Sequence, residues 1–268
     1  MMSDVRFSLD KLVAHRGLQL NYPENTALSL AKAVEFGALF IELDIQFSSD
    51  CLPIINHDAD LQRVSGQSGN ICDYSRDQLL QLPAFEPERL GNRFKSERIA
   101  PLEAIVNLLK NNPQVTAFVE LKEESIAHCG REAMLAEVQA ILEPVKHQTV
   151  IISYDYLLVL RAREHHWPKV GVVLKQWHDI ESEIVKNTDS DFIFVDHEII
   201  PETIDLHALT LAPLVAYEVD NIQLGQQLMA KGVCMLETYE LESFVAETTD
   251  QEAVKIVSTE CLHDYPLG

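Results

Sequence analysis

The strongest constraint on the fold is a regular alternation of short apolar runs with segments of helical periodicity. Runs such as 115–121 have the length of buried strands, and segments such as 26–36 repeat apolar residues every three or four positions. About eight such units follow one another. Strands that alternate with helices pair in parallel, so this number predicts a closed (β/α)8 barrel. An open doubly wound sheet is the alternative, but no glycine-rich dinucleotide or phosphate-loop motif supports it.

The predicted segments cover most of the chain. Strands are expected at residues 12–15, 39–46, 53–58, 115–121, 149–154, 170–174, 191–196, 214–219 and 233–236, and helices at residues 26–36, 101–110, 126–142, 156–164, 180–186, 201–206, 222–231 and 241–246. Between residues 59 and 100 the periodicity weakens, which predicts a small insertion after the second barrel strand. No linker divides the chain, so we expect residues 1–268 to form a single domain.

The charge of the chain limits its partners. A formal net charge of −21 argues against non-specific binding to nucleic acid or to an anionic membrane. No run approaches the length of a membrane helix, and residues 1–12 have no apolar leader core, so we expect a cytoplasmic protein without a membrane anchor. The five cysteines are scattered and form no disulfide framework, which predicts free thiols in a reducing compartment. The sequence predicts no particular oligomeric state.

Two carboxylates interrupt the apolar strand 39–46. Glu42 and Asp44 are two residues apart, so in a strand they lie on the same face. Adjacent anions in an apolar strand are unfavourable unless a cation lies between them. An exposed face of an edge strand is the alternative explanation, and the pair alone does not decide between the two.

Polar residues at the ends of other predicted strands favour a metal site. Active sites of such barrels lie at the carboxyl ends of the strands, where Glu120 would join Glu42 and Asp44. Three carboxylates suit Mg²⁺ or Ca²⁺. Cysteine ligands, which would favour zinc, are absent from this set. Arg16 ends the first predicted strand and Lys122 ends the strand that carries Glu120, and both are suited to bind a phosphate beside the metal.

Two histidines complete this set. His15 and His57 each follow an apolar run and precede polar residues. A lone histidine is more often structural or exposed, and we assign most of the ten histidines to the surface. Two imidazoles at strand ends beside a metal site can instead form a base–acid pair near neutral pH.

Six short motifs in this order resemble the glycerophosphodiester phosphodiesterase family. They are His15-Arg16-Gly17, Pro23-Glu24-Asn25-Thr26, Glu42-Leu43-Asp44, Asn56-His57-Asp58 with Arg63 following, Pro101-Leu102-Glu103 and Glu120-Leu121-Lys122. Beyond residue 150 the resemblance is looser and includes Ser153-Tyr154, where the family commonly has Ser-Phe. The resemblance implies a (β/α)8 barrel with an insertion after the second strand, which matches residues 59–100.

The resemblance also implies hydrolysis of a small glycerophosphodiester to glycerol 3-phosphate and an alcohol, with a divalent cation. By motif, the implied roles are metal ligands for Glu42, Asp44 and Glu120, general acid and base for His15 and His57, phosphate contacts for Arg16 and Lys122, and orientation of His57 for Asp58. Tyr217 stands where the family often has Trp, and we expect it to contact substrate or pack the rim. Tyr239 stands where Asp is usual, which removes one carboxylate.

Two other functions are weighed against this one. A lysophospholipase D-like activity on lysophospholipids would need an apolar channel or a membrane-docking surface, which the acidic chain disfavours. A non-catalytic barrel that binds metal or phosphoester would not need the His15 and His57 pair. Hydrolysis of glycerophosphodiesters is therefore the preferred prediction.

Overall fold

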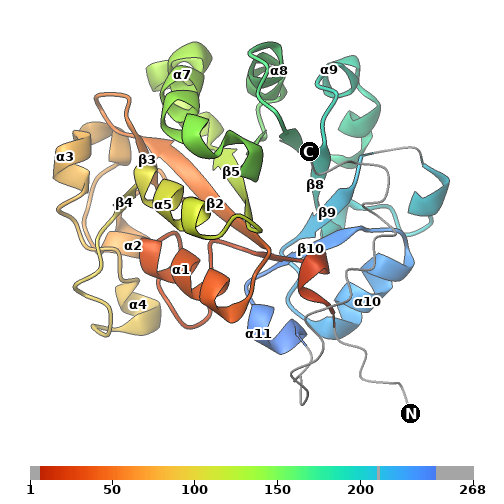
Figure 1. Cartoon of the computed structure of the whole chain (residues 1–268), viewed down its shortest axis with the longest axis horizontal. Coiled ribbons are helices and arrows are strands. Elements are labelled where there is room, and N and C mark those ends of the chain that lie inside the picture. The colour runs from red at the N-terminus through yellow and green to blue at the C-terminus, as the bar shows by residue number, and fades with distance from the viewer. Residues whose placement is uncertain (1–6, 210–211, 246–268) are drawn as a thin grey trace.

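The barrel strands are short, parallel and hydrogen-bonded in a closed ring (Figure 1). The computed structural model describes residues 7–209 and 212–245. Within these residues the ring consists of β1 (Leu12–Ala14), β2 (Phe40–Phe47), β5 (Thr116–Leu121), β6 (Thr149–Ser153), β7 (Val170–Val173), β8 (Phe192–Asp196), β9 (Leu214–Tyr217) and β10 (Met235–Thr238). Strand β1 pairs with both β10 and β2, which closes the barrel. The predicted (β/α)8 barrel is confirmed, and the open sheet is excluded.

Helices surround this ring and connect its strands (Figure 1). They are α1 (Ala27–Phe36), α5 (Glu103–Asn111), α6 (Ile126–Cys129), α7 (Arg131–Leu142), α8 (Tyr156–Glu164), α9 (Glu183–Asn187), α10 (Ile222–Ala230) and α11 (Leu241–Phe244). Short 3-10 turns are η1 (Leu9–Lys11), η3 (Glu123–Ser125), η4 (Glu143–Gln148), η5 (Trp177–Glu181), η6 (His197–Ile199) and η7 (Leu206–Ala208). Of the described helices, none has the length and apolar character needed to cross a bilayer.

Two predicted helices are wrong in detail. The helix expected over 126–142 is divided at Gly130, whose φ of 78° lies outside the helical region. The helix expected to begin at Pro201 does not form. A turn occupies that position, and η7 follows it. In both cases the apolar spacing correctly predicts which residues are buried. Local backbone geometry nevertheless divides the first helix and prevents the second.

Side-chain alternation along the strands separates two apolar layers. On β2, Ile41, Leu43 and Ile45 pack in the large cluster that also contains the helices. The opposite face looks into the barrel, where a second cluster is centred on Phe118, whose ring contacts Phe192 and Phe194 edge-on. Glu120 lies on the same strand face as Phe118, one pleat nearer the carboxyl end. The apolar interior thus ends where the polar site begins.

The segment after β2 forms its own small structure. Strand β3 (Pro53–Ile55) runs antiparallel to β2 and to β4 (Ala100–Pro101). Between them lie α2 (Gln62–Ser65), η2 (Ile71–Asp73), α3 (Arg76–Leu79) and α4 (Pro87–Leu90). A separate apolar cluster stabilises this segment and comprises Ile54, Leu61, Val64, Ile71, Leu79, Ala84 and Ile99. The assignment of residues 1–268 to one domain stays a prediction.

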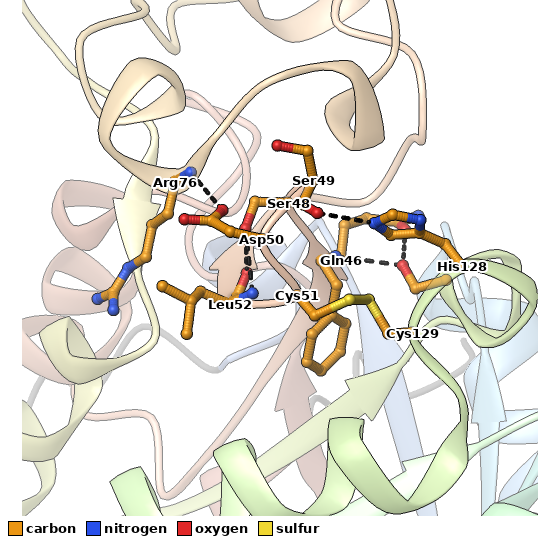
Figure 2. The surroundings of a disulfide bond; sticks show 11 residues. Gln46, Ser48, Ser49, Asp50, Cys51, Leu52, Arg76, His128 and Cys129 are labelled. Carbon is orange, nitrogen blue, oxygen red and sulfur yellow. Dashed lines mark hydrogen bonds between the residues drawn. A yellow bond between two sulfur atoms is a disulfide. The ribbon is translucent and has the colours of Figure 1, made fainter.

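A disulfide joins Cys51 to Cys129, 78 positions further along the chain (Figure 2). The prediction that the cysteines are free thiols is therefore wrong for this pair. Cys51 follows β2 and Cys129 ends α6, which follows β5. Since β2 and β5 are neighbours in the barrel, the connections after them lie side by side. This proximity depends on strand order, which cysteine spacing does not contain. Cys72 is an exposed thiol, and Cys261 lies outside the described residues.

Hydrogen bonds around this disulfide also join the two connections. The Ser125 hydroxyl donates to Gln46 Oε1 at 2.8 Å. His128 Nε2 lies 3.2 Å from the Ser49 carbonyl oxygen (Figure 2). Gln46 in turn donates from Nε2 to the His57 carbonyl oxygen at 2.9 Å. The hydrogen bonds beside the disulfide therefore extend to the backbone of His57, one of the predicted catalytic histidines.

Candidate active site

A cavity of about 80 Å³ opens at the carboxyl ends of the barrel strands. Its lining comprises His15, Arg16, Asp44, His57, Glu120, Lys122, Ile152, Tyr154, Val173, Phe194, Tyr217, Glu218 and Glu237. Seven of the eight predicted site residues therefore line one cavity. The eighth, Glu42, is buried beside them. The convergence of residues from strands far apart in sequence agrees with the usual location of active sites in this fold.

Strand register brings the three predicted metal ligands together. Asp44 on β2 lies directly opposite Glu120 on β5, and Glu42 lies one pleat nearer the amino end. Carboxylate oxygens of all three lie within 4.8 Å of one another. Burial raises the pKa of Glu42 well above its ordinary value, and the charge of Asp44 raises it further. Glu42 Oε1 is buried without a hydrogen-bond partner. This set of hard oxygen donors fits a divalent cation, which would offset the repulsion.

Arg16 is fixed against two of these carboxylates by an unusual backbone turn. Its φ of 53° is left-handed, and Gly17 follows with a φ of 84°. The Arg16 amide donates to Glu42 Oε2 at 3.0 Å, and its Nε lies 3.2 Å from Asp44 Oδ2. A side chain at position 17 would collide with Ser29. The His-Arg-Gly motif thus requires glycine in order to direct the guanidinium into the cavity.

Lys122 supplies a second buried cation on the other side of Asp44. Its Nζ lies 3.4 Å from Asp44 Oδ1 and 2.9 Å from Glu120 Oε1. Burial by itself lowers the pKa of Lys122, but the two carboxylates outweigh burial and raise it. Burial by itself likewise raises the pKa of Asp44, yet Lys122 and Arg16 hold it below its usual range. The site therefore combines ionised Asp44 with two permanent cations.

His57 enters the cavity from the segment that follows β3. Its Nδ1 lies 2.6 Å from Asp58 Oδ1, and Arg63 Nε donates to Asp58 Oδ2 at 2.7 Å. Burial raises the pKa of Asp58, but the hydrogen bonds to His57 and Arg63 outweigh it and keep the pKa below its usual range. An ionised Asp58 accepts a hydrogen bond from Nδ1 of His57. Nε2 of His57 is then the ring nitrogen that can exchange a proton with substrate.

His15 faces the same carboxylates from β1. Gln19 Nε2 lies 3.1 Å from His15 Nδ1, while His15 Nε2 lies 3.3 Å from Glu237 Oε1 and 4.0 Å from Glu42 Oε2. Burial, reinforced by the positive charge of Arg16, lowers the pKa of His15 well below its ordinary value.

Sequence reasoning missed several residues of this site. Glu237 and Tyr154 both line the cavity, and the Tyr154 hydroxyl lies 2.6 Å from that of Tyr217. Glu237 lies in β10, two residues before Tyr239, which follows the strand. The available signal for Glu237 was a carboxylate at the end of the last predicted barrel strand, close to the position where the usual carboxylate is lost.

Comparison with known proteins identifies the relationship. The sequence profile of the glycerophosphoryl diester phosphodiesterase family matches residues 15–197, which is more than half of the chain. The chain belongs to this family. The matched part includes all the predicted site residues except Tyr217.

Individual relatives agree with this family assignment. Glycerophosphodiester phosphodiesterase from Caldanaerobacter subterraneus is 30% identical over 174 residues, covering 62% of this chain and 70% of that protein. Human glycerophosphodiester phosphodiesterase 1 is 37% identical over 153 residues, covering 57% of this chain and 45% of that protein. The mouse protein of the same name is 39% identical over 111 residues, covering 41% and 33%. The chain thus spans less than half the length of these mammalian relatives.

Solved structures share the same fold. A phosphodiesterase from Oleispira antarctica, in complex with the product sn-glycerol-3-phosphate, has a TM-score of 0.75 and 22% identity, covering 87% of this chain and 94% of that chain. A glycerophosphodiester phosphodiesterase from Parabacteroides distasonis has a TM-score of 0.71 and 19% identity, with the same coverage. At these identities the likeness establishes the barrel fold.

Proposed function

We propose that this protein hydrolyses glycerophosphodiesters to glycerol 3-phosphate and an alcohol, with the help of Mg²⁺ or Ca²⁺. One observation carries the proposal: three carboxylates, two cationic side chains and two histidines line or adjoin a single cavity. Family membership and the Oleispira complex with sn-glycerol-3-phosphate support the same substrate class.

In this proposal Glu42, Asp44 and Glu120 hold the cation. A bound cation would neutralise phosphate charge and increase the reactivity of the attacking hydroxyl or water. Arg16 and Lys122 bind the non-bridging phosphate oxygens, the former as a planar fork and the latter as a compact charge. Both cations are already held at the cavity by Asp44, so they need little reorganisation when substrate arrives.

His15 and His57 transfer the protons of the reaction. One accepts a proton from the attacking group, and the other donates a proton to the leaving alcohol. Asp58 orients the His57 ring through Nδ1. Tyr217, held by its contact with Tyr154, contacts the glycerol or the alcohol part of the substrate.

The cytoplasmic location stays a prediction. The Cys51–Cys129 bond weighs against it, because disulfides persist mainly in oxidising compartments.

A substrate panel tests the activity and its alternatives. Purified protein is incubated with glycerophosphocholine, glycerophosphoethanolamine and lysophosphatidylcholine, each with added Mg²⁺ or Ca²⁺ and each with EDTA. We expect glycerol 3-phosphate from the first two substrates only, and we expect EDTA to abolish it. Choline release from lysophosphatidylcholine alone would favour the lysophospholipase D-like activity. Turnover of none of the three with metal present would favour a non-catalytic barrel.

A further inference from the structure

Glu237 is a buried carboxylate that neither the motif comparison nor the proposed mechanism uses. It lies on β10, opposite Val13 of β1, and only 3% of its surface is exposed. The amide of His15 donates to the carbonyl of Thr238 at 3.1 Å, so the last residues of β1 and β10 remain in register. This register places the Glu237 side chain beside the His15 ring.

The His15 ring has a polar partner at each nitrogen. Gln19 Nε2 is a donor, so Nδ1 of His15 is the acceptor at 3.1 Å. In a neutral ring the hydrogen then belongs to Nε2, and this nitrogen lies 3.3 Å from Glu237 Oε1. Glu42 Oε2 is further away, at 4.0 Å. Of these two carboxylates, Glu237 is therefore the nearer to the nitrogen that carries the ring hydrogen.

The position of Glu237 is unfavourable for stability. It is only 3% exposed and adds another acidic group to a site that already contains Glu42, Asp44 and Glu120. Burial raises the pKa of Glu237 well above its ordinary value, and the charges of Glu120 and Asp44 raise it further. An apolar side chain could fill the same space in the barrel without the free-energy cost of burying a carboxyl group among other acidic groups. A carboxylate at such a position is better explained by activity than by stability.

We propose that Glu237 is a positioning residue for His15: it accepts the Nε2 hydrogen and, together with Gln19, fixes the orientation of the imidazole at the cavity. The inference rests on the proposed role of His15. Glu237 lies within β10, two residues before Tyr239, so this chain has a carboxylate inside the strand and none at the following position where the family usually has one.

Two variants of Glu237 separate its role as a hydrogen-bond acceptor from an effect of its volume or its charge. Glu237→Gln keeps an oxygen acceptor of the same size, whereas Glu237→Leu removes the acceptor and keeps the volume. We expect Glu237→Gln to retain kcat within about threefold and Glu237→Leu to lower kcat roughly 100-fold, with KM nearly unchanged, because a misplaced catalytic group has an effect of that size. Glu242→Gln, an exposed acid on the neighbouring helix α11, is the control and should have no effect.

Two further readouts make the result decisive. Thermal unfolding should show Glu237→Leu to be at least as stable as the wild type, so that its lost turnover is not a folding defect. Nitrogen-15 NMR of the imidazoles should show His15 with its hydrogen on Nε2 in the wild type and a changed signal in Glu237→Leu. The NMR readout requires no turnover, so it tests the inference even where the proposed activity fails.

Three results would overturn the inference. The first is wild-type kcat in Glu237→Leu. The second is an equal loss in Glu237→Gln and Glu237→Leu, which would mean that charge rather than an acceptor is required. The third is full recovery of both variants at raised Mg²⁺ or Ca²⁺, which would make Glu237 a metal ligand.

Discussion

Lys122 Nζ lies 3.4 Å from Asp44 Oδ1, across the neighbouring strands β5 and β2. The same ammonium lies 2.9 Å from Glu120 Oε1. Two of the three proposed metal ligands thus share a permanent cation. A divalent ion at these oxygens would be attracted by the carboxylates and repelled by Lys122.

This relationship predicts opposite effects of Lys122→Met on metal and substrate. Removing the ammonium should lower the Mg²⁺ concentration that gives half-maximal activity, because the repulsion is gone. The same change should lower kcat/KM roughly 100-fold, because one charge that stabilises the phosphate is lost. Metal titrations of steady-state activity measure both quantities. Lys175→Met, which removes an exposed lysine paired with Glu123, is the control. If Lys122→Met lowers the Mg²⁺ concentration for half-maximal activity but leaves kcat/KM unchanged, Lys122 does not bind the substrate phosphate.

The disulfide predicts a large loss of stability on its removal. Replacing Cys51 and Cys129 by Ser should lower the free energy of unfolding by roughly 4 kcal/mol, because the bond links positions 78 residues apart and restricts the unfolded chain. Urea unfolding with and without a reducing agent measures this. Cys72→Ser, at an exposed thiol, should change nothing. If reduction leaves the unfolding midpoint of the wild type unchanged, the bond does not stabilise the fold.

The Asp155 carboxylate, which does not line the cavity, should make a pH-dependent contribution to the stability of the fold. Burial raises its pKa, but paired hydrogen bonds from Arg131 and the Leu158 amide outweigh burial and lower it. The folded pKa is therefore below the unfolded one. The contribution to stability is complete above about pH 4, the unfolded value, and is lost as the pH falls through the folded pKa.

Asp155→Asn tests that sign. Asn can still cap α8, so only the ion pair is lost. We expect the variant to be about 1 kcal/mol less stable than the wild type at pH 7, and the difference to shrink as the pH falls below 4. Urea unfolding of the wild type and the variant, at pH 7 and at a pH below 4, measures the difference in free energy of unfolding. A difference that grows in acid would mean that the pKa of Asp155 is raised instead.

The Tyr154–Tyr217 contact predicts a small effect. Tyr217→Phe removes one hydroxyl of the 2.6 Å pair but keeps the ring. We expect KM for glycerophosphocholine to rise about fivefold, since one neutral hydrogen bond is worth about 1 kcal/mol. An unchanged KM together with unchanged kcat would mean that the Tyr217 hydroxyl takes no part in substrate binding.

Much of the fold was predictable because it depends on local pattern. Period-two alternation on 39–46 and helical spacing on 26–36 each specify an element, and their repetition specifies the barrel. The convergence of Glu42, Asp44 and Glu120 also followed, since carboxyl ends of parallel strands meet at one rim.

Other features depend on which distant segments become neighbours. The Cys51–Cys129 bond requires β2 and β5 to be adjacent, and the Glu237–His15 contact requires β10 to close onto β1. Spacing along the chain contains neither relationship. The break at Gly130 depends on a single backbone dihedral, which apolar periodicity also does not report.

The most direct test of the whole account is glycerol 3-phosphate release from glycerophosphocholine by the wild type, His15→Ala and His57→Ala, with Mg²⁺ or Ca²⁺ present. The account predicts measurable turnover by the wild type, abolished by EDTA, and a loss of at least about 100-fold in each variant, with unfolding midpoints showing that both remain folded. Near-normal rates in both folded variants would contradict it.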